Sequence, residues 1–304
     1  MIDLKTQLSQ DFILDNPLMT ASGTCGYGDD LGEVVDIENY GGIVTKSLSL
    51  KPRKGNPPPR IVETPSGMIN SIGLANIGVH AFLEKKKTAL KKYSGKLIVN
   101  IAGETQDEFL KIAEILEGED WIDGYEINVS CPNVKKGGIA FGTDPKVLYE
   151  LTAKIREKTN KYLIIKLSPN VTDIGNLALK AQQAGADAVS LINTFYGAAI
   201  NIHTRKPKIN SIIGGLSGPA IKPAAIAKVI QTAQKVDIPI IGIGGITTGA
   251  DVIEFMLAGA SAVELGTVHF MNPAAVVEIK QDLLEYCDQQ GISSLQKIIG
   301  KAEI

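Results

Sequence analysis

Short apolar runs alternate along the chain with stretches of helical spacing. Runs such as Leu163-Ile164-Ile165 lack polar alternation, which is typical of strands buried on both faces of a parallel sheet. Between the runs, apolar residues recur three and four positions apart, and Thr105 with Glu108 predicts a capping box at one helix start. The predicted strands comprise residues 17–22, 42–47, 97–102, 125–130, 162–168, 188–193, 238–243 and 262–267.

This alternation predicts an α/β fold, a (β/α)8 TIM barrel in which residues 1–304 form a single domain. The opening segment carries Leu4, Phe12 and Leu14 around a polar turn. We expect it to form a short hairpin that closes the amino-terminal end of the barrel.

Two connections, residues 48–96 and 194–237, are too long for simple turns between a strand and a helix. Both follow strand carboxyl ends, where the loops of a barrel build the active site. The first contains the charged stretch 51–60, whose prolines exclude a strand or helix interior. That stretch is either a solvated surface loop or a segment that covers a substrate.

The charge balance argues against nucleic acid as a partner. The chain has 31 Lys and Arg against 33 Asp and Glu, a net charge of −2, and aromatic residues make up 5% of it. It therefore offers neither a basic surface nor a platform for stacking bases. No apolar stretch reaches the roughly 18 residues of a membrane span, and no signal peptide is evident, so we expect a cytoplasmic protein.

Cysteine and histidine usage gives little support for a metal centre. The three cysteines include no Cys-x-x-Cys pair, so we expect no iron–sulfur cluster and no structural zinc site in this chain. The three histidines show no ligand spacing, which also disfavours a catalytic metal.

Polar residues end most of the predicted strands. One such lysine could be a snorkelling side chain and one asparagine a turn former, but so many at equivalent strand ends indicate a shared ligand site. They are Ser22, Lys46, Asn100, Asn128, Lys166, Asn193, Thr194 and Thr267.

Glycine-rich turns follow the last two predicted strands, at residues 242–248 and 265–267. Their backbone N–H groups and the helix starts after them predict a phosphate site, which barrels often place there. A dinucleotide fingerprint is the weaker alternative, because Thr247 stands where its third glycine should be.

Cys131 lies in a predicted loop over this site, with Pro132 after it and Lys135 and Lys136 nearby. We interpret it as a catalytic thiol, and inert packing is the alternative. Cys25, beside the first strand, is the rival candidate, and Cys287, on a predicted helix, is interpreted as structural.

These residues resemble a known family, the class 1 dihydroorotate dehydrogenases. Variants at residues 68–73 and 135–138 resemble the class 1B catalytic subunit more than the fumarate-using class 1A enzyme. The motifs that carry the resemblance are Ala21-Ser22-Gly23, Thr45-Lys46-Ser47, Gly55-Asn56-Pro57-x-Pro59-Arg60, Asn70-Ser71-Ile72-Gly73-Leu74-x-Asn76, Asn128-x-Ser130-Cys131-Pro132-Asn133 and Lys166-Leu167-Ser168-Pro169.

The resemblance implies an FMN-bound barrel that oxidises (S)-dihydroorotate to orotate in pyrimidine biosynthesis. It implies that Cys131 is the catalytic base and that Lys166 stabilises negative charge on the reduced flavin. We expect the loss of Lys166 to affect flavin binding and reduction more than folding.

The resemblance also implies two overlapping sets of binding residues. Those for substrate are Lys46, Asn70, Ser71, Ile72, Gly73, Leu74, Asn128, Asn193 and Thr194. Those for FMN are Ser22, Lys46, Asn100, Asn128, Lys166, Ile192, Gly218, Gly244, Gly245, Gly266 and Thr267.

Class 1B membership further implies a second polypeptide that carries FAD and a [2Fe-2S] cluster and passes electrons to NAD⁺. Two catalytic chains would then form the homodimer core of a heterotetramer. The alternatives that stay open are the class 1A enzyme, a dihydropyrimidine dehydrogenase, a phosphate-binding barrel lyase or isomerase, and a non-catalytic flavoprotein.

Overall fold

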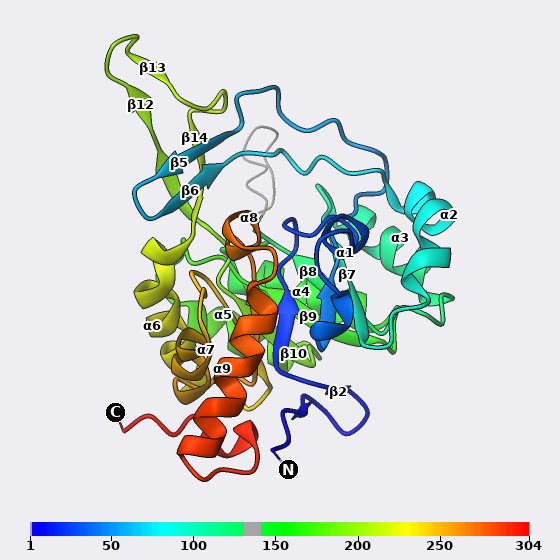
Figure 1. Ribbon diagram of the computed structural model, residues 1–304. Coiled ribbons are helices and arrows are strands. Elements are labelled where there is room, and N and C mark those ends of the chain that lie inside the picture. Colours follow the sequence, from blue (N-terminus) through cyan, green and yellow to red (C-terminus); the bar gives the residue numbers. More distant parts are fainter. Residues whose placement is uncertain (1, 131–140, 304) are drawn as a thin grey trace.

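A closed barrel of eight parallel strands forms the centre of the computed structural model, which describes residues 2–130 and 141–303 (Figure 1). The strands follow one another around the barrel in chain order, so the predicted TIM barrel is confirmed. They are β3 (Leu18–Thr20), β4 (Gly42–Val44), β7 (Lys96–Ile101), β8 (Gly124–Asn128), β9 (Tyr162–Lys166), β10 (Ala188–Leu191), β15 (Ile240–Ile243) and β16 (Ala262–Leu265).

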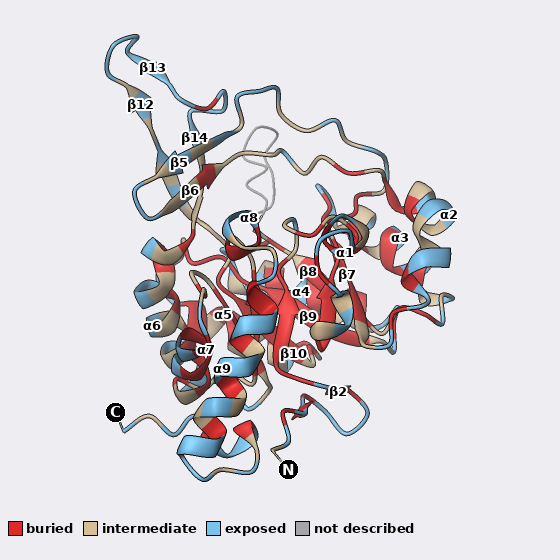
Figure 2. Cartoon of the chain, viewed as in Figure 1, coloured by how far each residue is buried: buried red, intermediate tan, exposed pale blue. Residues whose placement is uncertain are grey.

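Helices surround the barrel and connect its strands (Figure 1). Strands β9, β10, β15 and β16 are buried throughout, which explains their lack of polar alternation. Figure 2 shows the centre of the barrel in red, the colour of buried residues. The longer helices are α2 (Val79–Leu90), α3 (Gln106–Glu117), α4 (Pro145–Arg156), α5 (Ile174–Gln183), α6 (Lys222–Ala233), α7 (Gly249–Leu257) and α9 (Ala275–Gln289). In the described part of the chain, none of the helices is long and apolar enough to cross a membrane.

The start of helix α3 differs in part from the prediction. The Thr105 side chain accepts a hydrogen bond from the Glu108 backbone N–H, as expected. The Glu108 carboxylate, however, accepts from the Glu104 N–H rather than from Thr105. A complete capping box occurs instead at α7, between Thr248 and Asp251.

The predicted amino-terminal hairpin is confirmed as β1 (Thr6–Gln7) paired with β2 (Ile13–Leu14). Phe12 stacks on Tyr162, the first residue of β9, with ring centroids 4.0 Å apart. Leu8, Phe12 and Leu14 join a buried cluster with Ile164 and other residues near the strand starts. The hairpin therefore seals the amino-terminal end of the barrel with apolar side chains.

The two long connections meet in a four-stranded antiparallel sheet of order β11-β14-β6-β5. It stands beyond the end of the barrel opposite the hairpin (Figure 1). Its strands are β5 (Ile61–Thr64), β6 (Gly67–Asn70), β11 (Phe195–Ala198) and β14 (Ile213–Ser217). Shorter elements are β12 (Ile200–Asn201), β13 (Lys206–Pro207), α1 (Asp29–Gly32), α8 (Val268–Met271), η1 (Ile37–Asn39), η3 (Pro219–Ile221) and η4 (Leu295–Ile298).

Candidate active site

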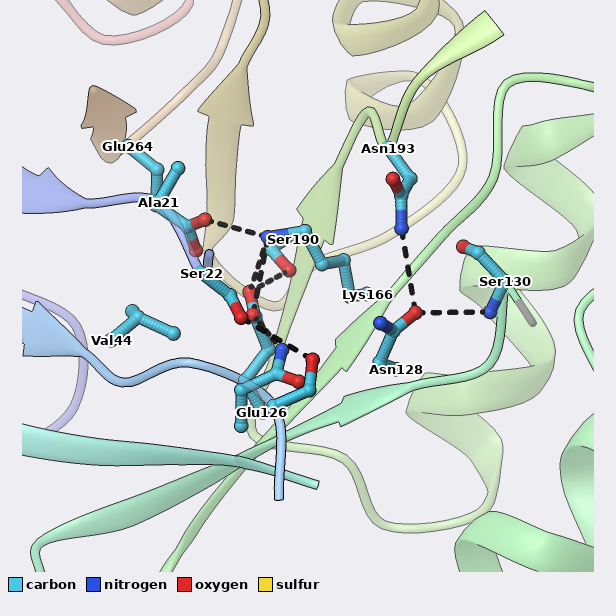
Figure 3. A network of polar contacts seen from close by, with 12 residues as sticks. Ala21, Ser22, Val44, Glu126, Asn128, Ser130, Lys166, Ser190, Asn193 and Glu264 are labelled. Carbon is cyan, nitrogen blue, oxygen red and sulfur yellow. Dashed lines mark hydrogen bonds and ion pairs between the residues drawn. The ribbon is translucent and has the colours of Figure 1, made fainter. Parts of the chain in front are cut away.

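A buried lysine lies between two buried carboxyl groups inside the barrel. Lys166 ends β9, and its Nζ lies 2.8 Å from Glu264 Oε2 and 3.1 and 3.3 Å from the two oxygens of Glu126 (Figure 3). The side chain of Lys166 is 6% exposed, and both glutamates are fully buried. Neither acid was predicted as a site residue, although each is the one carboxylate in its predicted strand.

Burial and charge act in opposite directions on these three groups. Burial alone would lower the pKa of Lys166, but the fields of Glu126 and Glu264 outweigh it and raise that pKa. Burial likewise favours neutral Glu126, yet Lys166 and the hydrogen bonds to its carboxylate lower the pKa. Burial and the neighbouring Glu126 charge raise the pKa of Glu264 well above its usual range.

Two polar side chains complete the surroundings of Glu126. Asn100 Nδ2 donates to Glu126 Oε1 at 2.5 Å, and Ser190 Oγ donates to Oε2 at 2.7 Å. The buried Oδ1 of Asn100 has no hydrogen-bond partner among the described residues. A buried acceptor left open in this way suits a ligand that brings an N–H or O–H donor.

The ends of β8 and β10 bring two predicted asparagines together. Asn193 Nδ2 lies 3.4 Å from Asn128 Oδ1, which also accepts the Ser130 N–H at 3.2 Å (Figure 3). Asn193 Oδ1 accepts the Thr194 N–H at 2.8 Å. These amides are only partly buried, so they present donors and acceptors at the barrel mouth.

The antiparallel sheet brings Asn70 to the same region. Asn70 Nδ2 lies 3.4 Å from the carbonyl oxygen of Gly215, its partner across β6 and β14. A Cβ at Gly215 would lie 2.2 Å from Thr194 Oγ1, so only glycine fits between these residues. The sheet thus places Asn70 near Thr194, far along the chain.

Asn56 holds the predicted substrate segment that follows β6. Its Nδ2 donates to the carbonyl oxygen and the Oγ of Ser71, and its N–H donates to Ile72. Gly73 and Leu74 then adopt left-handed conformations, with φ of 72° and 55°. The Asn56 contacts explain why the segment keeps this turn.

Ser22 and Lys46 follow adjacent strands of the barrel, β3 and β4. Ser22 Oγ lies 3.5 Å from Ser47 Oγ, and the Lys46 N–H donates to Gly26 at 2.7 Å. Both predicted residues are partly exposed at the carboxyl end of the barrel.

The glycine-rich turns at residues 242–248 and 265–267 present backbone N–H donors, and we call them the glycine cradle. The N–H groups of Gly245 and Thr267 donate to no protein acceptor within residues 2–130 and 141–303, and Gly244 continues the β15 ladder just before them. A Cβ at Gly245 would lie 2.8 Å from the Gly218 carbonyl oxygen, so the first turn lies close to the residue that precedes η3. Thr267 Oγ1 and Ser217 Oγ lie 2.8 Å apart. This arrangement suits a phosphate group.

Two further predicted residues border this cradle. Ile192 is buried after β10, and its N–H donates to the carbonyl oxygen of Ile243 at 3.0 Å. A Cβ at Gly266 would lie 3.3 Å from Ala21 Cβ, next to the end of β3. Ile192 and Gly266 therefore connect the cradle to the neighbouring strands.

The start of helix α7 is not an open anion site, which corrects one expectation. The Asp251 carboxylate accepts the N–H groups of Thr247 and Thr248 at 2.8 and 2.9 Å. Lys222 Nζ in turn lies 2.6 Å from Asp251. Because the protein supplies its own carboxylate, a phosphate would be held by the glycine turns rather than by this helix.

The structure describes two of the three cysteines, Cys25 and Cys287. Cys131 lies outside the described residues, directly after Ser130 in the sequence. Cys25 is buried, and burial raises the pKa of its thiol to about 11, which disfavours it as a base at neutral pH. Cys287 is fully buried on α9, as its structural interpretation predicted.

Comparisons with known proteins agree with the sequence motifs. A family model described as dihydroorotate dehydrogenase matches residues 4–286. A Thermoanaerobacter protein (strain X514) named dihydroorotate dehydrogenase B (NAD(+)), catalytic subunit, is 52% identical over 291 residues, 96% of each chain. A protein of the same name from Geobacter sulfurreducens is 50% identical over 302 residues, 99% of each chain.

A solved structure shows the same fold. It is the dihydroorotate dehydrogenase of Eimeria tenella in complex with ferulenol, which superimposes with a TM-score of 0.81 at 23% identity. The match covers 98% of this chain and 88% of that one. The names of the two bacterial relatives also agree with the class 1B resemblance seen in the sequence. On this evidence the chain belongs to the dihydroorotate dehydrogenase family.

Proposed function

We propose that this chain uses FMN to oxidise (S)-dihydroorotate to orotate in the pyrimidine pathway that leads to UMP. The observation that carries the proposal is the convergence of three features at one barrel mouth. These are the buried Lys166 cation, the Asn128–Asn193 amide pair and the glycine cradle. The family to which the chain belongs supports the same reaction.

The described residues fit FMN at both of its ends. The open N–H groups of Gly245 and Thr267 suit its phosphate. Lys166 and the unpartnered Asn100 Oδ1 offer a cation and an acceptor to the ring system. When bound, FMN supplies the acceptor for the hydride that leaves the substrate.

The chain's own residues orient the substrate and move a proton. Asn70, Asn128, Asn193 and Thr194 offer the donors and acceptors that a planar ring with carbonyl and N–H groups requires. In this proposal Cys131 removes the proton from C5 of dihydroorotate. A thiol suits this role because its ordinary pKa, about 8.5, is within reach of neutral pH.

The test of the proposal is flavin reduction by the Cys131→Ala variant. We expect FMN to stay bound and its anaerobic reduction by dihydroorotate to slow by at least about 100-fold, because a general base is lost. The Cys25→Ala variant is the matched control and should reduce FMN almost normally. Near-normal bleaching by Cys131→Ala would refute the assignment, and preferential bleaching by dihydrouracil would favour a dihydropyrimidine dehydrogenase.

We further propose that the electrons reach NAD⁺ through a second polypeptide in the cytoplasm. Relatives of this length are named catalytic subunits of an NAD(+) enzyme, and this sequence has no adequate dinucleotide fingerprint. In the proposed assembly two catalytic chains form the core of a heterotetramer. Each is paired with a subunit that holds FAD and a [2Fe-2S] cluster.

The isolated chain should therefore reduce artificial acceptors with dihydroorotate but should not reduce NAD⁺. Adding the electron-transfer subunit should restore NADH formation, measured by absorbance. Efficient NAD⁺ reduction by the isolated chain would contradict the partner. Fast turnover with fumarate would instead assign the chain to class 1A.

A further inference from the structure

The two buried glutamates around Lys166 differ in how well their carboxyl groups are satisfied. Glu126 accepts hydrogen bonds from Lys166, Asn100 and Ser190. Glu264 receives only Lys166 on Oε2, and its Oε1 has no hydrogen-bond partner among the described residues. The Glu126 carboxyl also acts on the Glu264 carboxyl. Figure 3 shows the carboxyl group of Glu264 directed at Lys166.

Charge counting shows why both glutamates cannot be ionised together. One ammonium between two carboxylates would leave a net charge of −1 in a fully buried site. An uncompensated charge away from water is costly, and two adjoining carboxylates resolve this by holding one proton between them. Three side chains, those of Lys166, Asn100 and Ser190, donate hydrogen bonds to Glu126 and stabilise its ionised form. The shared proton therefore belongs on Glu264.

Within residues 2–130 and 141–303, Lys166 is the cation that contacts these two glutamates. The charged groups that act on Glu264 from the described elements are Lys166 on β9 and Glu126 on β8. The thiol of Cys25, near β3, is the other titratable neighbour, and it is neutral at pH 7. The neighbouring strand β15 contributes only Ile240, Ile241, Gly242 and Ile243.

We propose that Glu264 is a positioning residue that stays protonated at neutral pH, anchoring Lys166 while keeping the Lys166–Glu126–Glu264 cluster neutral. An ionised Glu264 would add a negative charge behind Lys166 and oppose the charge of a reduced flavin. This consequence for the cofactor rests on the proposed function, whereas the protonation itself does not.

Infrared spectroscopy of the protein as purified tests the protonation directly. At pH 7 ordinary Asp and Glu side chains are ionised, since their pKa values are about 4. We expect one carboxylic-acid C=O band to persist at pH 7 and to vanish in Glu264→Gln, but not in the exposed control Glu63→Gln. A wild-type spectrum without that band, or its survival in Glu264→Gln, would overturn the inference.

Flavin affinity provides a second measurement, because it depends on the net charge of the Lys166–Glu126–Glu264 cluster. The measured quantity is the ratio of dissociation constants for oxidised and reduced FMN. In Glu264→Gln a neutral group replaces a neutral group, and in Glu126→Gln the remaining Glu264 ionises beside Lys166. Each single variant should therefore change the ratio by no more than about twofold.

The double variant Glu126→Gln/Glu264→Gln leaves Lys166 uncompensated. It should favour reduced FMN by at least about tenfold, which equals about 30 mV for a two-electron couple. If both glutamates were ionised, Glu264→Gln alone would already raise the ratio by a similar factor, and the inference would fail. If the wild-type protein bound no FMN, the proposed function would be refuted. The infrared measurement would still test the protonation of Glu264.

Discussion

Replacing Lys166 by methionine isolates the contribution of its charge to stability. Methionine keeps an unbranched chain of similar length, so little packing is lost. The ammonium group that contacts Glu126 at 3.1 Å and Glu264 at 2.8 Å is removed. Because Glu264 is neutral in our interpretation, the variant leaves one buried carboxylate, Glu126, without a cation.

Stranding a buried charge by removing its partner costs about 3–5 kcal/mol. With an unfolding entropy of about 2.1 cal/mol/K per residue, a chain of 304 residues should lose about 5–8 °C in its thermal midpoint. The expectation from sequence is that loss of Lys166 affects flavin binding and reduction more than folding, and the buried ion pairs add this cost to folding. The lysine at this strand end also neutralises the barrel interior.

The assay is thermal unfolding of the FMN-free proteins at pH 7, at one scan rate for every variant. The matched control is Lys166→Met/Glu126→Gln, which removes the stranded carboxylate together with the cation. It should regain more than half of the lost midpoint. A Lys166→Met midpoint within about 1 °C of wild type, or a double variant no more stable than the single one, would refute this reasoning.

Two other predictions concern backbone shape and pH. Gly245→Ala should cost about 1–2 kcal/mol in the free energy of unfolding and weaken FMN binding, since φ is 74° there and the new Cβ would lie 2.8 Å from Gly218. Flavin fluorescence titration checks the binding, and an equal effect of Gly266→Ala, where the nearest atom lies at 3.3 Å, would contradict it. Burial lowers the pKa of His269 from 6.5 to about 4, so the folded protein binds this proton less readily than the unfolded chain. Stability should therefore fall by up to about 3 kcal/mol as pH drops from 6.5 towards 4, and denaturant titrations of His269→Gln should show a flatter pH dependence.

Local sequence determined much of this molecule. Apolar runs without polar alternation favour strands buried on both faces, and the helical stretches between them favour parallel connections. Polar residues at strand ends then converge, because parallel strands place their carboxyl ends at one rim. For this reason Asn128, Lys166 and Asn193 could be assigned to one site from the sequence.

The tertiary structure alone decided which distant residues meet. Asn70 and Thr194 both lie against Gly215 because β6 pairs with β14, and cross-strand pairing between two long loops leaves no periodic signal in either. Glu126 and Glu264 are each the one carboxylate of their strand, and the sequence does not tell whether such a residue points into the barrel or towards the helices. Closure of the barrel turns both towards Lys166, where burial makes the charge of each depend on the others. That mutual dependence arises from low dielectric and short distance, which exist only after the strands have come together.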